Sequence, residues 1–545
     1  MAQTRGWKSA RWDPSTPAFN SYETSDGAPL TTDYNLSTDG RFPGILQLGP
    51  LLTTIDCAAA DGAAPSVTNV IDMVFSETME TEDYLMASRG KRPAMIATST
   101  RTLSSNGTAT AFAANADRRS VFTLAEAGTE EISVPITGNN AYQVITAISG
   151  ASHTFTANNE AIVNHIFGKN TSKDAAGQVF GFGLTAAIEN TVRSNPITGV
   201  VTMDASAWVE RSQMTAFYLK YTGVAWWNNF IYVGTNIGPF YVNDDFQAFQ
   251  LRIPEAANSP NDKNCVAMFA WSKLGVVIPM LRETRLFINA EGVRIGPEAF
   301  ENNTSPIRGR MTAGDANELW AMVAIYNQFT DQTYICAMRP RMGKENSIHT
   351  NQVSYFPIAV LTAGHECEAI RWAGTKGGVS RGTWYIGDDD DVDWCIEGLS
   401  DRFPDDTGVL TFNASGTWVG TEKRFPISEE KKPRYLSFET ANCAVGNETV
   451  NIQFTYVDRT GTSRTTTGMV TITKNGKQIV EVPKAMQFWA TRFKPVVTLA
   501  RGATTTNTPR LIGDIEVIWE YREAGDVGLH YFDFASGTLR QLEGD

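Results

Sequence analysis

The chain has 545 residues, of which 42% are hydrophobic and 19% are charged, and its formal net charge is −13. This length predicts roughly two to four domains, and the charged fraction lies below the ~25% of ordinary soluble domains, which we interpret as a mainly β protein with Thr- and Asn-rich surfaces. A nucleic-acid reader needs a basic face that displaces counterions from phosphate, so the deficit of Lys and Arg argues against that class. The short basic stretches at 89–93 and 429–434 favour solvated turns.

Residues 1–65 are rich in Pro, Gly, Ser, Thr and Asp and show no sustained period. Aromatic residues are rare in disordered tails, yet Trp7, Trp12, Phe19 and Tyr22 are scattered through this segment. We therefore predict an extended N-terminal arm that is pinned against a partner.

From 66 to 400, short segments rich in β-branched and aromatic residues are closed by turn clusters, which predicts many strands. Coupled pairs of such segments begin near 224, 266, 320 and 368, and a four-stranded propeller blade needs ~40–50 residues. We predict a degenerate β-propeller over 66–400, with no WD or kelch signature and the number of blades left open. Trp226 and Trp227 are expected to pack between blades rather than to grip a ligand.

Helical patterns are few. Residues 158–169 and 184–193 have roughly helical spacing and predict short helices on loops. Residues 315–329 also read as a helix, but their β-branched and aromatic half favours a buried strand.

After about 400 the apolar and polar residues alternate strictly, as in "TVNIQFTYVD" (449–458) and "IEVIWEY" (515–521). This pattern predicts an antiparallel β-sandwich at about 405–522, within a C-terminal domain 401–545 that ends in a tail. Asn475-Gly476 lies between two alternating segments and predicts a β-hairpin.

The acidic run Asp388–Asp391 with Asp393 stands out among candidate sites. The spacing of Asp389, Asp391 and Asp393 imitates the start of a calcium loop, but Trp394 occupies the glycine position and Ser400 the position of the final glutamate. We favour a solvated turn between strands and leave cation binding at 388–393 open.

In "GHEC" (364–367), His365, Glu366 and Cys367 are consecutive, so on a strand they point to alternate faces and do not converge on a metal. The five histidines are dispersed, and we find no nucleophile elbow, no H-E-x-x-H and no phosphate loop. The glycine-rich stretch 374–382 is predicted to be a flexible loop. We expect no catalytic residues, no cofactor and no metal site, and hence no enzyme.

The first 20 residues contain no apolar stretch of signal-peptide length, and the longest apolar run that we find, 274–281, is far short of a membrane span. We therefore expect neither export nor membrane insertion. The six cysteines are far apart and form no C-x-x-C pair, so neither a disulfide framework nor a zinc pattern is indicated. Buried free thiols are predicted at Cys57, Cys265, Cys336, Cys367, Cys395 and Cys443.

A glycan-binding or glycan-hydrolysing β-propeller is the alternative. A hydrolase of this kind needs two converging carboxylates, or an arginine cluster with Asp-box turns in a sialidase. "NASGTW" (413–418) resembles the end of an Asp box only superficially, because it lacks the aspartate. Acidic residues abound, and nothing in the sequence selects one pair.

The blade-like segments "FIYVGTNIGPFYV" and "RGTWYIGD", the aromatic-rich N-terminal segment and the later "KKPRYLSFETANC" resemble bacteriophage tail proteins in which a β-propeller precedes a β-sandwich. The resemblance covers about 220–520, with Pro433–Leu436 where a strand enters the second domain. It implies a virion structural protein of the tail nozzle, tail tip or adaptor ring. Such a subunit would form a ring with itself and with neighbouring virion tail proteins, made and assembled in the host cytoplasm, and DNA would pass through the channel without specific binding.

Overall fold

The computed structural model describes most of the chain. The described residues are 5–12, 38–39, 45–57, 69–79, 82–88, 94–105, 122–126, 129–136, 141–149, 152–158, 165–169, 178–182, 191–196, 209–213, 221–228, 230–242, 247–251, 253, 256, 259–271, 274–288, 291–296, 309–342, 348–374, 381–389, 391–399, 408–420, 423–424, 429–443, 447–458, 460–490, 492–523, 530–533 and 538–541. The chain divides into two compact units, which we describe separately. The propeller unit comprises 19–30 and 50–401, and the C-terminal unit comprises 1–18, 31–49 and 402–545.

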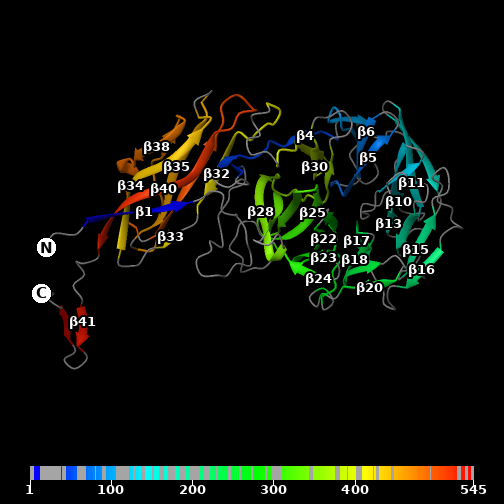
Figure 1. The fold of residues 1–545 in the computed structure, drawn as a ribbon, viewed down its shortest axis with the longest axis horizontal. Helices are drawn as coiled ribbons and strands as arrows, with labels where there is room; N and C mark the ends of the chain where they lie inside the picture. Colours follow the sequence, from blue (N-terminus) through cyan, green and yellow to red (C-terminus); the bar gives the residue numbers. More distant parts are fainter. Residues whose placement is uncertain are drawn as a thin grey trace. The chain divides into compact units, whose positions relative to one another are not determined.

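The described part of the propeller unit contains seven four-stranded antiparallel sheets, here called blades 1 to 7 in chain order (Figure 1). Blade 1 consists of β5 (Asp72–Met79), β6 (Glu82–Ser88), β7 (Ala94–Ala97) and β8 (Thr102–Ser105). Blade 2 consists of β9 (Phe122–Glu126), β10 (Thr129–Ile136), β11 (Ala141–Ser149) and β12 (Ser152–Asn158). Blade 3 consists of β13 (His165–Lys169), β14 (Gln178–Phe182), β15 (Thr191–Pro196) and β16 (Val209–Gln213). Blades 4 and 5 are β17 (Tyr221–Trp227), β18 (Phe230–Thr235), β19 (Gly238–Val242) and β20 (Ala248–Gln250); and β21 (Phe269–Trp271), β22 (Gly275–Pro279), β23 (Thr284–Ile288) and β24 (Glu291–Arg294). Blade 6 is β25 (Arg310–Ala316), β26 (Ala321–Asn327), β27 (Gln332–Met342) and β28 (Ile348–Val360), and blade 7 is β29 (Ile370–Ala373), β30 (Thr383–Asp388), β31 (Asp391–Ile396) and β4 (Thr53–Ile55).

The seven blades close into a ring. The first strand of each blade contacts the first strand of the next, and β29 of blade 7 contacts β5 of blade 1. Blade 7 takes its outermost strand, β4, from before blade 1 in the chain, with Val392 opposite Ile55. The expectation of a mainly β, propeller-like domain is therefore confirmed, and the described strands supply the blade number that the sequence left open.

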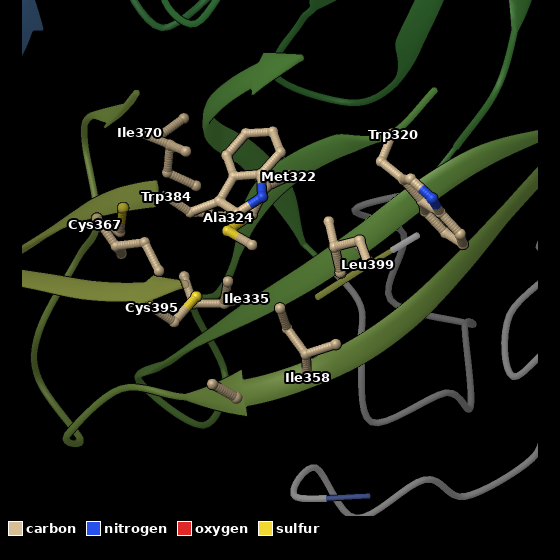
Figure 2. Close-up of a cluster of buried hydrophobic side chains, with 14 of the residues drawn as sticks. Trp320, Met322, Ala324, Ile335, Ile358, Cys367, Ile370, Trp384, Cys395 and Leu399 are labelled. Carbon is tan, nitrogen blue, oxygen red and sulfur yellow. The ribbon is translucent and has the colours of Figure 1, made fainter. Parts of the chain in front are cut away.

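Apolar side chains fill the spaces between adjacent blades. Strands β18 of blade 4 and β22 of blade 5 share one buried cluster, which includes Tyr232 and Ile278. A second cluster joins blades 6 and 7 around Met322, Ile358 and Trp384 (Figure 2). A third cluster joins blade 7 to blade 1 and includes Ile55 of the closing strand. Because blades pack face to face, their strands are apolar on both faces and read as continuous hydrophobic runs.

Close approach of the inner strands requires small residues. A Cβ atom on Gly314 of β25 would lie 2.4 Å from the ring of Phe269 on β21. Real Cβ contacts are never this short, so a larger residue at this position would push blades 5 and 6 apart.

Two expectations for single elements differ from the structure. The helices expected at 158–169 and 184–193 are absent from the described part of these segments, where β13 and β15 form strands instead. Sheet pairing overrides weak helical spacing in such short segments. The buried strand favoured within 315–329 is confirmed as β26.

Trp226 and Trp227 are neighbours in β17 but lie in different environments. Trp227 packs against the cluster between blades 4 and 5, as expected. Trp226 is 36% exposed, so the prediction that it packs between blades is wrong. Neighbouring residues of a strand point to opposite faces, which is why only one of the two enters the cluster.

The C-terminal unit contains two six-stranded antiparallel sheets in its described part. Sheet A has the order β2 (Thr38–Asp39), β3 (Ile45–Leu48), β40 (Arg510–Glu523), β34 (Glu429–Ala441) and β38 (Gly476–Glu481), with β1 (Arg5–Trp12) also paired to β40. Sheet B has the order β32 (Ser415–Val419), β39 (Arg492–Ala500), β35 (Thr449–Val457) and β36 (Ser463–Thr465), with β33 (Lys423–Arg424) on β39 and β37 (Val470–Ile472) on β35. A 3-10 turn, η3 (Lys484–Met486), and a hairpin of β41 (His530–Asp533) and β42 (Thr538–Gln541) complete the described elements.

The hairpin predicted at Asn475-Gly476 is wrong. The strand before this turn, β37, pairs with β35 in sheet B, whereas the strand after it, β38, pairs with β34 in sheet A. Gly476 has the positive φ of 93° that favours glycine, and the Asn475 side chain accepts a hydrogen bond from the backbone of Cys443 at 2.7 Å. The turn therefore carries the chain from one sheet to the other.

The first 65 residues, expected to form an extended arm, provide strands to both units. The whole of β1 pairs with β40, from Arg5 opposite Arg522 to Trp12 opposite Ile515, and β3 pairs with the other half of β40. Strand β4 belongs to blade 7. Phe19 and Tyr22 lie outside the described residues.

Candidate functional site at the closure of the ring

His365 of the "GHEC" stretch and the start of the acidic run at Asp388 meet at one end of blade 7. In an antiparallel blade the connections alternate between the two ends, so the turn between the second and third strands lies at the same end as the crossover from the preceding blade. His365 lies in the crossover before β29, and its Nδ1 is 2.7 Å from Oδ1 of Asp388, at the end of β30. Its Nε2 is 3.7 Å from Oδ2 of Asp389. The alternation of connections is the sequence signal that could have predicted this meeting.

Asp391 and Asp393 of the acidic run bind the closing strand β4 and the residue that follows it by two positions. The Thr54 hydroxyl of β4 donates to Oδ1 of Asp393 at 2.6 Å, and the Cys57 backbone N–H donates to Oδ1 of Asp391 at 2.8 Å. The Val70 N–H, just before blade 1, donates to the carbonyl of Asp389 at 2.6 Å. The expected turn between strands is present, but Asp393 is only 5% exposed, so the expectation of a solvated turn is wrong for this residue.

The pKa of Asp393 is raised to about 6, mainly by burial; the hydrogen bond from Thr54 opposes this rise, and the nearby carboxylates Asp388 and Asp391 add to it. A carboxyl that loses its hydration favours the neutral form unless hydrogen bonds replace the lost water. One carboxyl at the closure therefore carries a proton in mildly acidic solution.

The carboxyls of Asp388, Asp391 and Asp393 lie near one another, and each also has its own partner: His365, the Cys57 N–H and the Thr54 hydroxyl, respectively. Glu366 forms an ion pair with Arg310, His365 faces Asp388, and Cys367 is buried, so the "GHEC" residues diverge as predicted. Among the described residues, no group of three or more His, Cys, Asp or Glu side chains could hold a metal ion. Asp390 lies outside the described part.

A second polar connection crosses the inner strands of three blades. Arg371 of β29 donates from Nε and Nη2 to the carbonyl of Met73 on β5, at 2.9 and 2.7 Å. Its Nη1 is 3.7 Å from Oδ2 of Asp315 on β25. Burial raises the pKa of Asp315, and Arg371 and the N–H of Trp372 counteract this effect. Arg371 thus joins blades 6, 7 and 1 at the centre of the ring.

A small pocket opens between the crossover from blade 4 and the second turn of blade 5. It is lined by Ala256, Ser259, Asn264, Met280, Leu281, Arg282 and Glu283 and encloses about 270 Å³, including the part open to solvent. Two of its polar side chains, Asn264 and Glu283, already have partners. Glu283 binds Nε of Arg285 and Nε of Arg294, both at 2.5 Å, and the Asn264 side chain donates to the Asn236 carbonyl and accepts from the Leu281 N–H.

All six cysteines are free and buried, which confirms that prediction. Burial raises the pKa of the Cys265 thiol to about 12, and it also raises the pKa of Cys336. Only the thiolate is an effective nucleophile, so these groups are inert in the folded chain.

No protein-family model matches the chain, and no curated protein matches its sequence. Among solved structures, the chain is similar to the β-propeller domain of Cps50 (Swd1) from Myceliophteria thermophila, with a TM-score of 0.37, 10% identity and coverage of 64% of this chain and 99% of that one. It is also similar to a luciferin-regenerating enzyme, with a TM-score of 0.30, 12% identity and coverage of 65% and 96%. A third similar structure is the extracellular domain of a hybrid two-component system from B. thetaiotaomicron, with a TM-score of 0.36, 10% identity and coverage of 81% and 47%. No helix in the described part of the chain is long and apolar enough to cross a membrane.

Proposed function

We propose that the chain is a structural subunit of a bacteriophage tail, of the nozzle, tip or adaptor-ring type. In this proposal it forms a ring with copies of itself and with neighbouring tail proteins, around a channel through which DNA passes without specific binding. The observation that carries the proposal is that the side chains of His365, Asp388, Asp391 and Asp393 bind one another or adjacent segments of the chain where the ring closes.

These hydrogen bonds are suited to a structural subunit that must keep its fold when force acts on the tail. Thr54 and Asp393 are 339 positions apart in sequence, so their hydrogen bond holds the early strand β4 in blade 7, where it closes the ring. Closing a long loop restrains the unfolded chain, and bonds across such a closure therefore favour the folded ring. Net charge of −13 suits a channel wall along which DNA slides without adhering.

We infer that sheets A and B form a β-sandwich, because Phe493 of sheet B and Trp519 of sheet A lie edge to face with ring centroids 6.0 Å apart. Buried and half-buried residues alternate along β39, as expected for a strand with one face in a sandwich core. In the proposed subunit, residues 1–65 form the extended N-terminal arm that is pinned against a partner, and its described strands β1 to β3 belong to sheet A and β4 to blade 7.

One observation favours the second candidate, a glycan-binding or glycan-hydrolysing propeller. The closure brings together Asp388, Asp391 and Asp393, and the pKa of Asp393 is raised to about 6. A protonated carboxyl beside an ionised one is the arrangement that glycoside hydrolases use. The low exposure of Asp393 weighs against direct contact with a substrate.

Native mass measurement and negative-stain electron microscopy of the full-length chain test the proposal. A structural tail subunit is expected to form rings of more than two copies with a central opening, alone or after addition of tail proteins. Absence of any such assembly, combined with binding or cleavage of host-surface glycans that is lost in Asp393→Asn, would replace the proposal with the second candidate.

A further inference from the structure

Strand β38 lies at the edge of sheet A. In the described part of the C-terminal unit it pairs with β34 on one side and with no strand on the other. Its side chains alternate between half-buried and exposed, and Ile479 at its centre is 69% exposed. A free sheet edge that carries an exposed apolar residue is a template for pairing with another strand.

The backbone groups of β38 that point away from β34 can be identified from one hydrogen bond. The N–H of Val482 donates to the carbonyl of Arg434 at 2.8 Å, in register with Glu481 opposite Tyr435. Alternate residues of an antiparallel strand bond to opposite sides, so Gln478 and Val480 bond to β34 together with Val482.

The N–H and C=O groups of the intervening residues therefore point outward. These residues are Lys477, Ile479 and Glu481, and they are the ones with exposed side chains. Bonding groups and accessible side chains thus coincide on the same three residues.

We propose that β38 pairs with β38 of a second copy of this chain, antiparallel and centred on Ile479. In this register Ile479 lies opposite the partner's Ile479, and Lys477 lies opposite the partner's Glu481. The two-fold axis repeats the Lys–Glu pair, so both charge pairs are complementary. A strand of reversed or shifted register would place like charges together or leave Ile479 opposite a charge.

The neighbouring strand supports the same register. Glu439 of β34 lies opposite Lys477, so Lys477 would sit between Glu439 and the partner's Glu481. Tyr435 is exposed and lies opposite Glu481 within sheet A, on the same face as Ile479. The pairing would join two sheets A into one continuous sheet and cover the exposed apolar residues at its centre.

The contact is small, because three residues of each strand form about six backbone hydrogen bonds. We therefore expect a reversible dimer with a dissociation constant on the order of micromolar. A two-fold contact of this kind closes on itself and does not by itself build a ring. It does not depend on the proposed tail function, and either can fail without the other.

Sedimentation velocity of the full-length chain over a concentration series tests the pairing through charge variants. Lys477→Glu and Glu481→Lys each place like charges opposite each other twice, and each is expected to weaken the dimer about tenfold or more. An equimolar mixture of the two variants restores both charge pairs and is expected to regain the wild-type affinity. Lys474→Glu, on the exposed turn before β38, is the matched control and should leave the affinity unchanged.

The variant Ile479→Pro tests the contribution of backbone hydrogen bonds to the dimer independently of the charge pairs. The outward N–H of Ile479 bonds to nothing in sheet A, so this variant should fold, with an unchanged circular dichroism spectrum, and remain monomeric. A wild-type chain that stays monomeric at about 100 μM would overturn the proposal. So would a mixture of the charge variants that associates no better than either alone, or a folded Ile479→Pro that dimerises like the wild type.

Discussion

Thr54 donates a hydrogen bond to Asp393 at 2.6 Å and so joins the strand that enters the ring to the blade that completes it. The bond connects β4 and β31, whose pairing gives blade 7 its fourth strand. Thr54→Val removes the donor while keeping the shape of the side chain. The buried Asp393 then loses its closest partner, and we expect a loss of about 1–3 kcal/mol in the free energy of unfolding.

Urea unfolding of the full-length chain measures this loss. Thr54→Ser, which keeps the hydroxyl, should lose less than Thr54→Val. Equal stability of Thr54→Val and the wild type would show that the bond contributes nothing to closure.

The raised pKa of Asp393 gives a definite pH dependence. The folded chain holds this proton up to a pH of about 6, whereas the unfolded carboxyl has its ordinary pKa of 3.8, so Asp393 weakens the fold progressively as the pH rises between these two values. Asp393→Asn stays neutral and can still accept the Thr54 hydrogen bond. Its melting temperature should therefore exceed that of the wild type at pH 8, and the difference should shrink at pH 4.5. A difference that is the same at both pH values would contradict the assignment.

Arg371 is expected to stabilise the centre of the ring. Arg371→Met removes both donors to the Met73 carbonyl and leaves Asp315 without its cation, which should cost about 2–4 kcal/mol in unfolding free energy. Arg11→Met is the comparison, because the Arg11–Glu516 pair is 3.8 Å apart and Arg11 is 68% exposed, so the pair should contribute less than about 0.5 kcal/mol. Equal losses from the two variants would argue against a special role for Arg371.

Two tryptophans of the propeller unit should respond very differently to truncation. Trp384 is fully buried between blades 6 and 7, where it lies 4.7 Å from Trp372 between ring centroids, and Trp384→Ala should cost about 3–5 kcal/mol. Trp226→Ala, at an exposed position, should cost less than about 1 kcal/mol. Thermal denaturation of both variants makes the comparison, and a larger loss at Trp226 would contradict the packing described here.

The six buried thiols give a chemical test of the fold. Ellman's reagent should react with none of them within minutes in the native protein and with all six in guanidinium chloride. Fast reaction of one or more thiols in native protein would show that a region described as packed is open.

Local patterns of apolar and polar residues correctly predicted strands, because burial of side chains determines these patterns. The β-branched and aromatic runs of blades 4 to 7 gave the strands, because side chains such as Tyr232 and Ile278 must fill the spaces between blades. The alternation in β35 and β39 likewise reflects which face of each strand is buried.

These local patterns could not predict which strands pair with each other when the strands are far apart in the sequence. Strand β4 is only three residues long, Thr53–Ile55, and nothing within "TTI" specifies a partner more than 330 positions away. The Asn475-Gly476 turn misled for a related reason, since a favourable turn fixes a change of direction but not the sheet that receives the next strand. The candidate site was missed because His365 and Asp388 are 23 positions apart and meet only when the strands of blade 7 pair, a contact that neither local pattern specifies.

The most direct test of the proposed tail function is immunogold electron microscopy of virus particles from the source that encodes the chain. An antibody raised against the purified full-length protein is the probe, with particles incubated in pre-immune serum as the control. The proposal predicts gold at one fixed position on the tail, in repeated copies around its axis. Gold confined to other parts of the particle, or particles that lack the chain altogether, would contradict it.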